Sequence, residues 1–354
     1  MPAYILSTGA YRPRVQQPNH ALTERFFLKR GNKIHQKATV DILEKFTAVT
    51  EIRERSIALP EVSASRMGYL AAEEAIERGG VDREAIDYII VAHNWGDVST
   101  KHNFQDTLPN LAARIKSKLG IRNPRCVAYD ILFGCPGWLE GVRQVDLLIR
   151  SGEARYVLVV GTDTVSRVVE EYDVDSLLFS DGAGAALMAA SASPNTGVLA
   201  SATRSHCLEE LDYLRMGRSF SDRKYLDGLY LKMQGRQVFK YALREVPAVI
   251  TACLEKAEVD LRDVRYFIMH QANAKMIKAI ASRLFAQHGI ANYPEDVLPI
   301  NVYTKGNNSV ATIPTLLHEV IDRAHNQRGI ERGDLVVFAS VGAGMHVNAM
   351  IHRF

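Results

Sequence analysis

The hydrophobic residues of the chain follow two alternating patterns. Short runs rich in valine and isoleucine alternate with longer stretches in which apolar residues recur every three or four positions. The first pattern is typical of buried β-strands and the second of amphipathic helices, so the alternation predicts a layered α/β fold. Strands are predicted at 3–9, 87–92, 126–131, 156–161, 184–190, 197–204, 265–270, 297–302, 335–340 and 346–352. Helices are predicted near 64–79, 105–119, 136–151, 233–257, 273–288 and 309–328.

The second half of the chain repeats the first at an offset of 178 residues, close to half of the 354-residue length. The matched positions include Val81 and Val259, Tyr88 and Tyr266, Pro136 and Pro314, and Val157 and Leu335. A repeat of this length is too long for a solenoid. Two similar α/β halves are therefore predicted, residues 1–193 and 194–354, with their boundary in the turn-rich segment 191–197.

Composition narrows the class of protein. Hydrophobic residues make up 47% and charged residues 23%, which predicts a folded globular chain. The sequence has no apolar run of the about 20 residues that cross a bilayer. It also has no basic segment with a cleavage site near Met1, so a cytoplasmic location without membrane insertion is expected. The four cysteines lack metal-ligand spacing, so no metal site is predicted. A net charge of +3 does not indicate nucleic-acid binding.

Cys135 is the first candidate for chemistry. It lies in Asp130-Ile-Leu-Phe-Gly-Cys-Pro-Gly-Trp, after a predicted strand and at the start of a predicted helix. Proline is tolerated in a first helical turn, and Gly134 permits a sharp bend. A helix dipole stabilises a thiolate there and can lower its pKa from the free value of about 8.5. From these residues alone, a reactive cysteine and a buried inert one both remain open.

Two polar segments of the second half are further candidates. His270 ends a predicted strand, and the following Asn273 is the better N-cap for the next helix, so the imidazole has no evident structural role. Asn307 lies in Gly306-Asn-Asn-Ser, which is also ordinary turn sequence. The offset aligns Cys135 with Ile313, so the Asn307 turn is expected to face the Cys135 turn across one crevice.

Backbone N–H groups form another candidate. Val341-Gly-Ala-Gly344 lies between two predicted strands, and its glycines permit close approach to a ligand. The N–H groups of Cys135 and Ala343 are candidate oxyanion donors, an effect typically worth about 3 kcal/mol per donor. A plain hairpin turn remains the alternative.

At these residues the chain resembles the thiolase-like condensing enzymes, and among them the β-ketoacyl-acyl-carrier-protein synthase III group. The motifs, in order, are Ile52-Arg-Glu-Arg-Ser-Ile-Ala, the Cys135 turn, Val159-Val-Gly-Thr-Asp, Phe179-Ser-Asp-Gly-Ala-Gly-Ala, Met233-x-Gly-x-x-Val-Phe-Lys240, His270-Gln-Ala-Asn, Gly306-Asn-x-Ser and the terminal Gly-x-Gly. The resemblance implies a thiolase-like fold with duplicated halves in five α-β-α-β-α layers. It also implies a homodimer.

The resemblance implies a ping-pong reaction with Cys135, His270 and Asn307 as catalytic residues. An acyl thioester of coenzyme A or acyl carrier protein acylates Cys135. A malonyl thioester then loses CO₂, and the resulting carbanion or enolate attacks the acyl-cysteine, while His270 and Asn307 donate hydrogen bonds to the thioester oxygen. Such a reaction needs no cofactor beyond its substrates, and its setting is fatty acid or related polyketide biosynthesis.

Substrate binding departs from the family pattern. The Trp and Arg that sandwich the coenzyme A adenine in typical members are replaced by Lys45 and Val49, which makes a carrier-protein donor more credible. Arg167 matches a coenzyme A contact in the family. The residues that match carrier-docking positions are Lys240, Lys275 and Arg283. The polar loop 93–104 is a candidate for selecting the acyl group.

Two other functions remain open, and the sequence names neither the acyl starter nor the carrier. An acyltransferase or thioesterase on the same fold would use the acyl-cysteine without malonyl decarboxylation. The second alternative is a non-catalytic subunit of a heterodimer. The complete set of Cys135, His270 and Asn307 argues against it.

Overall fold

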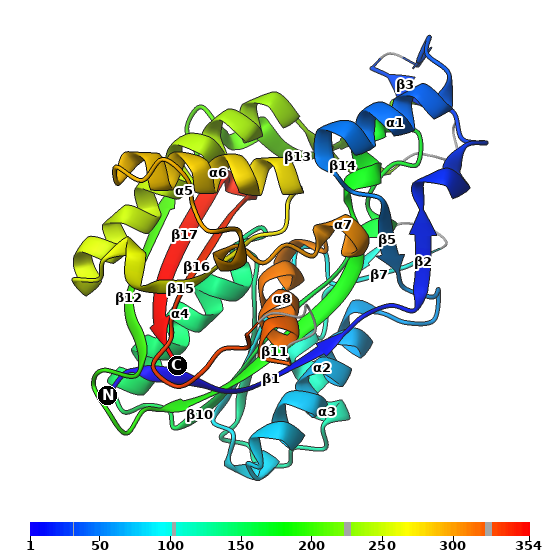
Figure 1. Ribbon diagram of the computed structural model, residues 1–354. Coiled ribbons are helices and arrows are strands. Elements are labelled where there is room, and N and C mark those ends of the chain that lie inside the picture. Colours follow the sequence, from blue (N-terminus) through cyan, green and yellow to red (C-terminus); the bar gives the residue numbers. More distant parts are fainter. Residues whose placement is uncertain (31, 101–103, 223–227, 323–327) are drawn as a thin grey trace.

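Two β-sheets form the frame of the molecule (Figure 1). The computed structural model describes residues 1–30, 32–100, 104–222, 228–322 and 328–354. The first sheet has the strand order β1 (Ala3–Tyr11), β11 (Asp181–Ala190), β10 (Tyr156–Thr164), β6 (Tyr88–Ala92) and β9 (Val127–Ile131). The second has the order β12 (Gly197–Ser205), β17 (His346–Arg353), β16 (Leu335–Gly342) and β15 (Val264–Met269).

The two sheets repeat one pairing pattern. Strand β11 runs antiparallel to β1 and β10, as β17 does to β12 and β16. Strands β6 and β10 are parallel, as are β15 and β16. Within the described residues only β9, at the edge of the first sheet, has no counterpart in the second. The repetition agrees with the offset in the sequence, and the boundary between residues 193 and 194 stays a prediction.

Helices α4 (Gly137–Arg150) and α8 (Thr312–Ile321) lie between the sheets. Apolar side chains of both helices and both sheets join there in one buried cluster. Trp138 of α4 is 1% exposed, and its ring meets Phe338 of the second sheet edge-on at a centroid distance of 6.4 Å. Its indole N–H donates to the carbonyl of Val159 in the first sheet at 3.3 Å, so one side chain connects both sheets.

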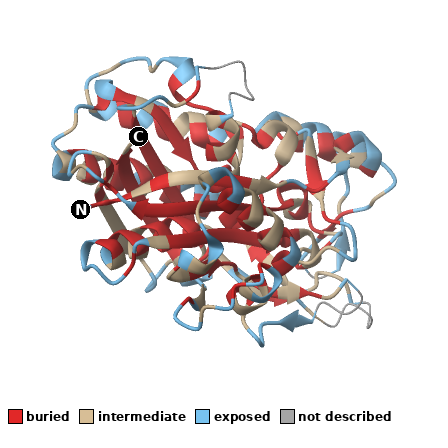
Figure 2. Ribbon diagram, turned by 90° about the horizontal axis from the view of Figure 1, so that it is seen from below, coloured by how far each residue is buried: buried red, intermediate tan, exposed pale blue. Residues whose placement is uncertain are grey.

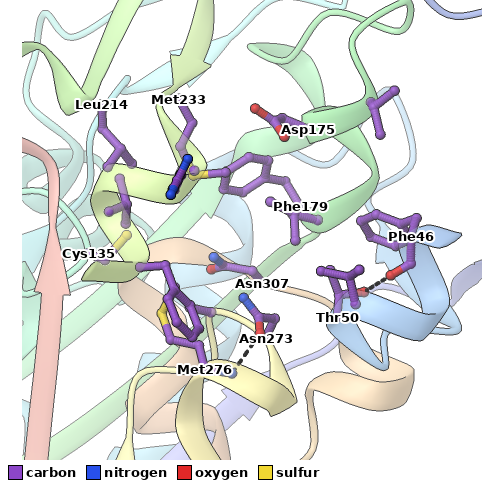
Figure 3. Close-up of a pocket in the computed structure, with 18 of the residues that line it drawn as sticks. Phe46, Thr50, Cys135, Asp175, Phe179, Leu214, Met233, Asn273, Met276 and Asn307 are labelled. Carbon is purple, nitrogen blue, oxygen red and sulfur yellow. Dashed lines mark hydrogen bonds between the residues drawn. The ribbon is translucent and has the colours of Figure 1, made fainter. Parts of the chain in front are cut away.

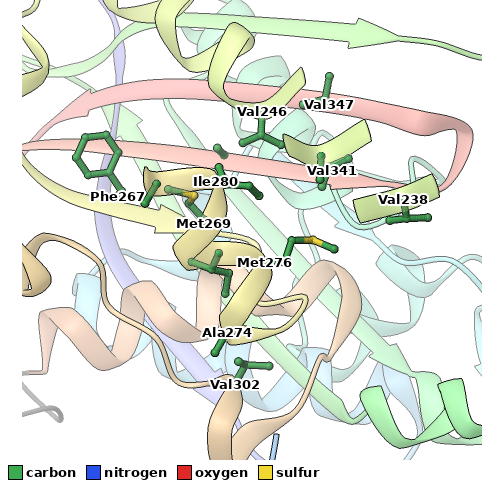
Figure 4. Packing of buried hydrophobic residues seen from close by; sticks show 14 of the residues in the cluster. Val238, Val246, Phe267, Met269, Ala274, Met276, Ile280, Val302, Val341 and Val347 are labelled. Carbon is green, nitrogen blue, oxygen red and sulfur yellow. The ribbon is translucent and has the colours of Figure 1, made fainter. Parts of the chain in front are cut away.

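The remaining long helices cover the outer faces. Helices α2 (Ala64–Gly79) and α3 (Leu111–Lys118) pack on the first sheet, and α5 (Gly235–Ala257) and α6 (Ala274–Gln287) pack on the second. Figure 4 shows Val246 and Ile280 of α5 and α6 beside Val341 and Val347 of β16 and β17. The outer surfaces of these helices are exposed, while most residues of the central strands β10, β11, β16 and β17 are buried (Figure 2). The order of layers is α-β-α-β-α, so the predicted thiolase-like fold is confirmed.

Side-chain caps fix where several helices begin. The Ser63 hydroxyl accepts from the N–H of Arg66 at 3.2 Å at the start of α2. Asn110 caps α3 in the same way, and the side chain of Asn273 accepts from the N–H of Met276 at 2.8 Å at the start of α6. Such caps satisfy N–H groups that have no partner within the helix. Asn273 is thus the N-cap that the sequence predicted, and His270 lies outside the helix.

The strand predicted at 297–302 is wrong. That segment contains a 3₁₀ turn at Glu295–Val297 and the short helix α7 (Val302–Lys305). Pro299 has no N–H to give to a strand ladder. The side-chain oxygen of Gln271 accepts from the N–H of Asn301 at 3.1 Å, so a side chain replaces the neighbouring strand as hydrogen-bond partner.

Two predicted helices are too long. The helix predicted at 105–119 begins only at Leu111, after β8 (Gln105–Asp106) has paired with β7 (Asp97–Val98). Of the helix predicted at 309–328, α8 covers Thr312–Ile321, and residues 323–327 lie outside the described residues. Elements that the sequence did not predict are α1 (Thr39–Thr50), β2 (Val15–Pro18), β3 (Leu28–Lys29), β4 (Lys33–Ile34), β5 (Glu54–Ile57), β13 (Leu214–Arg218) and β14 (Leu229–Met233). In the described parts of the chain, no helix has the length and hydropathy to span a bilayer.

Candidate active site

Cys135 lies in a tight turn between β9 and α4. Gly134 has a φ of +61°, a left-handed conformation that favours glycine. A side chain at Gly134 would also meet the backbone N and O of Ala343 at 2.8 Å. The N–H of Gly137 donates to the carbonyl of Gly134 at 3.0 Å and closes the turn. The half-buried Cys135 side chain is thereby placed at the N-terminal end of α4.

Burial dominates the acidity of the Cys135 thiol. Its pKa is raised to about 12, mainly by loss of hydration and to a smaller extent by the charge of Asp163, while the hydrogen bond with Ser309 acts in the opposite direction. The α4 dipole was predicted to lower the thiol pKa, but the effect of burial is larger and the net pKa is raised. A thiolate therefore forms here only if its proton has an acceptor.

His270 directly follows β15 and is 6% exposed. Its backbone N–H donates to the carbonyl of Ala339 at 2.8 Å, and its Nδ1 lies 2.7 Å from the hydroxyl of Thr312 at the start of α8. Burial lowers the pKa of the imidazole to about 4. The ring is therefore neutral near pH 7, with one nitrogen engaged by Thr312.

Asn307 follows Gly306, whose φ is +66°. Its backbone pairs with the segment before β11, because its N–H donates to Leu178 and its carbonyl accepts from Ser180, both at 2.9 Å. The side-chain oxygen of Asn307 accepts from the N–H of Ser309 at 2.9 Å. With the oxygen engaged in its own turn, the side-chain NH₂ is left as a donor.

One cavity of about 660 Å³ brings Cys135, His270 and Asn307 together. Figure 3 shows Cys135 and Asn307 bordering the same space, with Phe46 and Thr50 of α1 on another side of it. The rest of the wall is mainly apolar and includes Ile42, Val174, Leu178, Phe179, Leu214, Met233, Val238 and Met276. Exposed basic residues of the lining, Lys37, Lys45 and Arg236, give one part of the wall a positive charge.

Comparison with known proteins identifies the family. A model of 3-oxoacyl-[acyl-carrier-protein] synthase III matches residues 129–207, and the model of its C-terminal part matches residues 254–354. Over 352 residues the chain is 31% identical to a β-ketoacyl-[acyl-carrier-protein] synthase III of Pectobacterium atrosepticum, with 99% of each chain covered. The chain belongs to the β-ketoacyl-acyl-carrier-protein synthase III family.

Solved structures agree with this synthase III assignment. The fold matches 3-oxoacyl-[acyl-carrier-protein] synthase III of Aquifex aeolicus with a TM-score of 0.79 and 30% identity, covering 99% of this chain and 100% of that one. It matches the priming β-ketosynthase of a polyketide biosynthetic pathway with a TM-score of 0.81 and 27% identity, covering 99% and 96% of the two chains.

The other candidates of this synthase III chain lie outside the cavity. Ala343 packs against Gly134, next to the lining residues Val341 and Gly342, and its oxyanion role stays a prediction. The guanidinium of Arg167 donates to the backbone carbonyls of Val98, Leu59 and Val62, so its contacts are structural. The three predicted docking residues are exposed on α5 and α6, namely Lys240, Lys275 and Arg283.

Several site residues were not singled out from the sequence. The Ser309 hydroxyl lies 3.6 Å from the Cys135 sulfur, and Thr312 engages His270. Ser309 is the last residue of the Gly306-Asn-Asn-Ser motif and Thr312 follows three positions later, so this motif was the available signal. Asp175 lines the cavity, and burial together with the charge of Asp173 raises its pKa to about 7. No pattern in the sequence distinguishes Asp175 from a surface carboxylate.

Proposed function

We propose that this synthase III family member condenses an acyl group, carried on Cys135, with a malonyl thioester. The observation that supports the proposal is the meeting of Cys135, His270 and Asn307 in one mainly apolar cavity. The chain itself supplies the nucleophile and the hydrogen-bond donors that the reaction needs, so the proposed reaction uses no resident cofactor. The product is a β-ketoacyl thioester for fatty acid or polyketide biosynthesis.

In the first half-reaction Cys135 attacks an acyl thioester. The bond from its sulfur to the carbonyl carbon forms, the bond from that carbon to the carrier sulfur breaks, and the carrier leaves as a thiol. The N–H of Cys135 is the first donor we assign to the carbonyl oxygen, and that of Ala343 is the second. The apolar wall around Phe46 and Leu178 would take up the carbon chain of the acyl group.

In the second half-reaction the malonyl thioester loses CO₂, and negative charge develops on its thioester oxygen. The NH₂ of Asn307 is free to donate to that oxygen, since its side-chain oxygen is already engaged by Ser309. We assign the Thr312 hydroxyl, 2.7 Å from Nδ1 of His270, as the donor of that hydrogen bond, which puts the imidazole hydrogen on Nε2 as the second donor to the thioester oxygen. The malonyl C2 then bonds to the acyl carbon, and the Cys135 sulfur leaves.

Release of labelled CO₂ from a carboxyl-labelled malonyl thioester tests this function. We expect release to depend on a prior acyl donor and to match the amount of β-ketoacyl product. An acyltransferase or thioesterase would instead turn over the acyl donor with no release of CO₂. That result would overturn the condensation and leave acylation of Cys135 intact.

The positive residues near the cavity support an acyl carrier protein as one of the substrates. Arg236 and Lys240 lie on the first turns of α5, and Lys275 lies on the first turn of α6, close to the lining residues Phe239 and Met276. Lys45 and Val49 of α1 line the cavity where relatives are expected to sandwich adenine. A carrier protein is acidic, so attraction to this rim would position its thioester arm.

Lys240→Glu is expected to raise the KM for acyl carrier protein substrates about tenfold, which corresponds to ~1.4 kcal/mol. The KM for coenzyme A thioesters should change little, because Lys240 does not line the cavity. Lys256→Glu is the matched control on the same helix, about 24 Å further along α5. An equal loss for Lys256→Glu, or no dependence of the Lys240→Glu effect on salt, would contradict docking at this rim.

We also propose that the chain forms a homodimer through the edge of the first sheet. Strand β9 lies at that edge, its residues are exposed or half-buried, and the adjoining Leu132 is 66% exposed. An unpaired edge strand with exposed apolar residues is a common pairing surface. Sedimentation equilibrium should give twice the mass of 39.4 kDa, and a monomer would contradict the proposal.

A further inference from the structure

A buried polar network touches the Cys135 sulfur and is not used by the condensation described above. The Ser309 hydroxyl, 3.6 Å from the sulfur, accepts a hydrogen bond from the side-chain NH₂ of Asn94 at 3.1 Å. Asn94 donates to both oxygens of Asp163, through its backbone N–H and its side chain, each at 2.9 Å. Ser309 is also a side-chain hydrogen-bond partner of Asp163, so Cys135, Ser309, Asn94 and Asp163 form one continuous cluster.

Three different elements bring this cluster together. Asn94 follows β6, Asp163 lies near the end of β10, and Ser309 begins the turn before α8. The parallel strands β6 and β10 end at the same edge of the first sheet, where α/β folds place functional side chains. Ser309 has a φ of +55°, and its N–H donates to Asn307, so the residue that contacts the sulfur also orients the Asn307 side chain.

Asp163 is an unusual group in this position. Its side chain is 1% exposed, and within the described residues its carboxylate has no arginine or lysine partner in an ion pair. The imidazole of His93 is itself paired with Asp130 at 2.8 Å. A buried carboxylate without an arginine or lysine partner is costly, so its presence beside a nucleophile calls for a functional explanation.

We propose that Asp163 accepts the proton of the Cys135 thiol through the hydroxyl of Ser309 during acylation. The proposal rests on the proposed function, because it concerns the first half-reaction. As the bond from sulfur to acyl carbon forms, the thiol proton passes to the Ser309 oxygen and the hydroxyl proton of Ser309 passes to Asp163. When the carrier thiolate leaves, the proton returns along the same groups to the carrier sulfur. Atoms and charge balance without any further reactant.

The electrostatics of the cluster agree with this direction of transfer. Burial raises the pKa of Asp163 to about 6, against hydrogen bonds from Asn94 and Ser309 and the charge of His93. The other buried base of the site, His270, has a pKa lowered to about 4 and is the weaker acceptor. The ionised Asp163 raises the pKa of Cys135, so both groups do not ionise together. Moving the proton keeps a single negative charge in the buried cluster.

The test measures the rate of acylation in a single turnover across pH, with intact-protein mass spectrometry of quenched samples. The probe is the donor that labels wild type best among acetyl-, butyryl-, hexanoyl- and octanoyl-coenzyme A. Asp163 must be ionised to accept a proton, so the wild-type rate should rise with pH through an apparent pKa of about 6 and then level off. Asp163→Asn and Ser309→Ala should each lower the plateau about 10²-fold and lose this inflection.

A double variant and a control make the result specific. Because Ser309 and Asp163 act in one relay, Ser309→Ala/Asp163→Asn should be no slower than the slower single variant. Asp146→Asn is the control, because it removes a buried carboxylate of α4 that bonds to Ala3 and Arg150 instead of the cluster. It should keep the wild-type pH profile.

Two outcomes would overturn the relay. One is an inflection near pH 6 that persists in either single variant, and the other is a double variant whose loss equals the product of the single losses. A merely structural role of Asp163 would lower the rate at every pH and leave the inflection in place. If wild type formed no acyl-enzyme at any pH, the proposed function would fail instead, so the two failures are distinguishable.

Discussion

Cys135→Ala is expected to abolish the transfer of a labelled acyl group to the protein. The methyl side chain of alanine cannot form a thioester, and no other cysteine lines the cavity of the described residues. Without an acyl-enzyme, the ping-pong route is closed, and turnover should fall by at least ~10⁴-fold. Intact-protein mass spectrometry after incubation with labelled acyl-coenzyme A measures the loss directly.

The control for this experiment is Cys207→Ala. Cys207 is the exposed thiol of the chain and the first candidate for non-enzymatic acylation, whereas Cys126 and Cys253 are buried. Cys207→Ala should keep the full wild-type label. Label that persists in Cys135→Ala and maps to Cys207 or Cys253 would sink the assignment of the nucleophile.

Much of the fold follows from the sequence because its cause is local. The runs 157–160 and 335–338 consist only of large apolar residues, which are stable only when buried. Each forms part of a central strand with one parallel and one antiparallel neighbour. The repeat at offset 178 then predicts two similar α/β halves. The failed strand prediction has one local cause and one distant cause. In 297–302 the apolar residues suggested a strand, but Pro299 lacks an N–H and the Gln271 side chain supplies the acceptor instead.

Helix α1 could have been predicted and was not. Ile42, Leu43, Phe46 and Thr50 recur at helical spacing and are buried on one face. The omission matters for function, because Ile42 and Phe46 form part of the cavity wall.

Site residues that lie in a local motif could be predicted from the sequence, whereas contacts between residues far apart in the chain could not. The turns that contain Cys135, His270 and Asn307 each have a recognisable local motif, so a family resemblance is enough to select them. Asp163 and Ser309 of the network behind Cys135 end two of the quoted motifs, but the motifs do not show that these residues meet, because Ser309 is 174 residues from Cys135 and 215 from Asn94 along the chain. The pKa of the Cys135 thiol likewise has one local cause and one that depends on distant segments. The helix dipole is visible in the sequence, whereas the burial that outweighs it depends on how distant segments pack.

Asn307→Ala is expected to separate the two half-reactions. Loss of one donor to a developing oxyanion typically lowers a rate by about 10²–10³-fold, and here the loss should fall on decarboxylation and condensation. Acylation of Cys135 should persist, since the donors proposed for that step are backbone groups. Quantifying acyl-enzyme and labelled CO₂ in the same samples measures both half-reactions.

Asn307→Asp distinguishes two roles of residue 307, donation of a hydrogen bond to the substrate and support of its own turn. Its carboxylate can still accept from the N–H of Ser309, as the Asn307 oxygen does at 2.9 Å, so the turn keeps its hydrogen bond. It has no NH₂ to donate, and its charge repels an enolate, so condensation should fall at least as far as in Asn307→Ala. Normal condensation by Asn307→Asp together with loss in Asn307→Ala would mean that residue 307 acts by supporting the turn. Loss in both variants with acylation preserved assigns the donation to the Asn307 amide, and leaves His270 Nε2 as the second donor to the same oxygen.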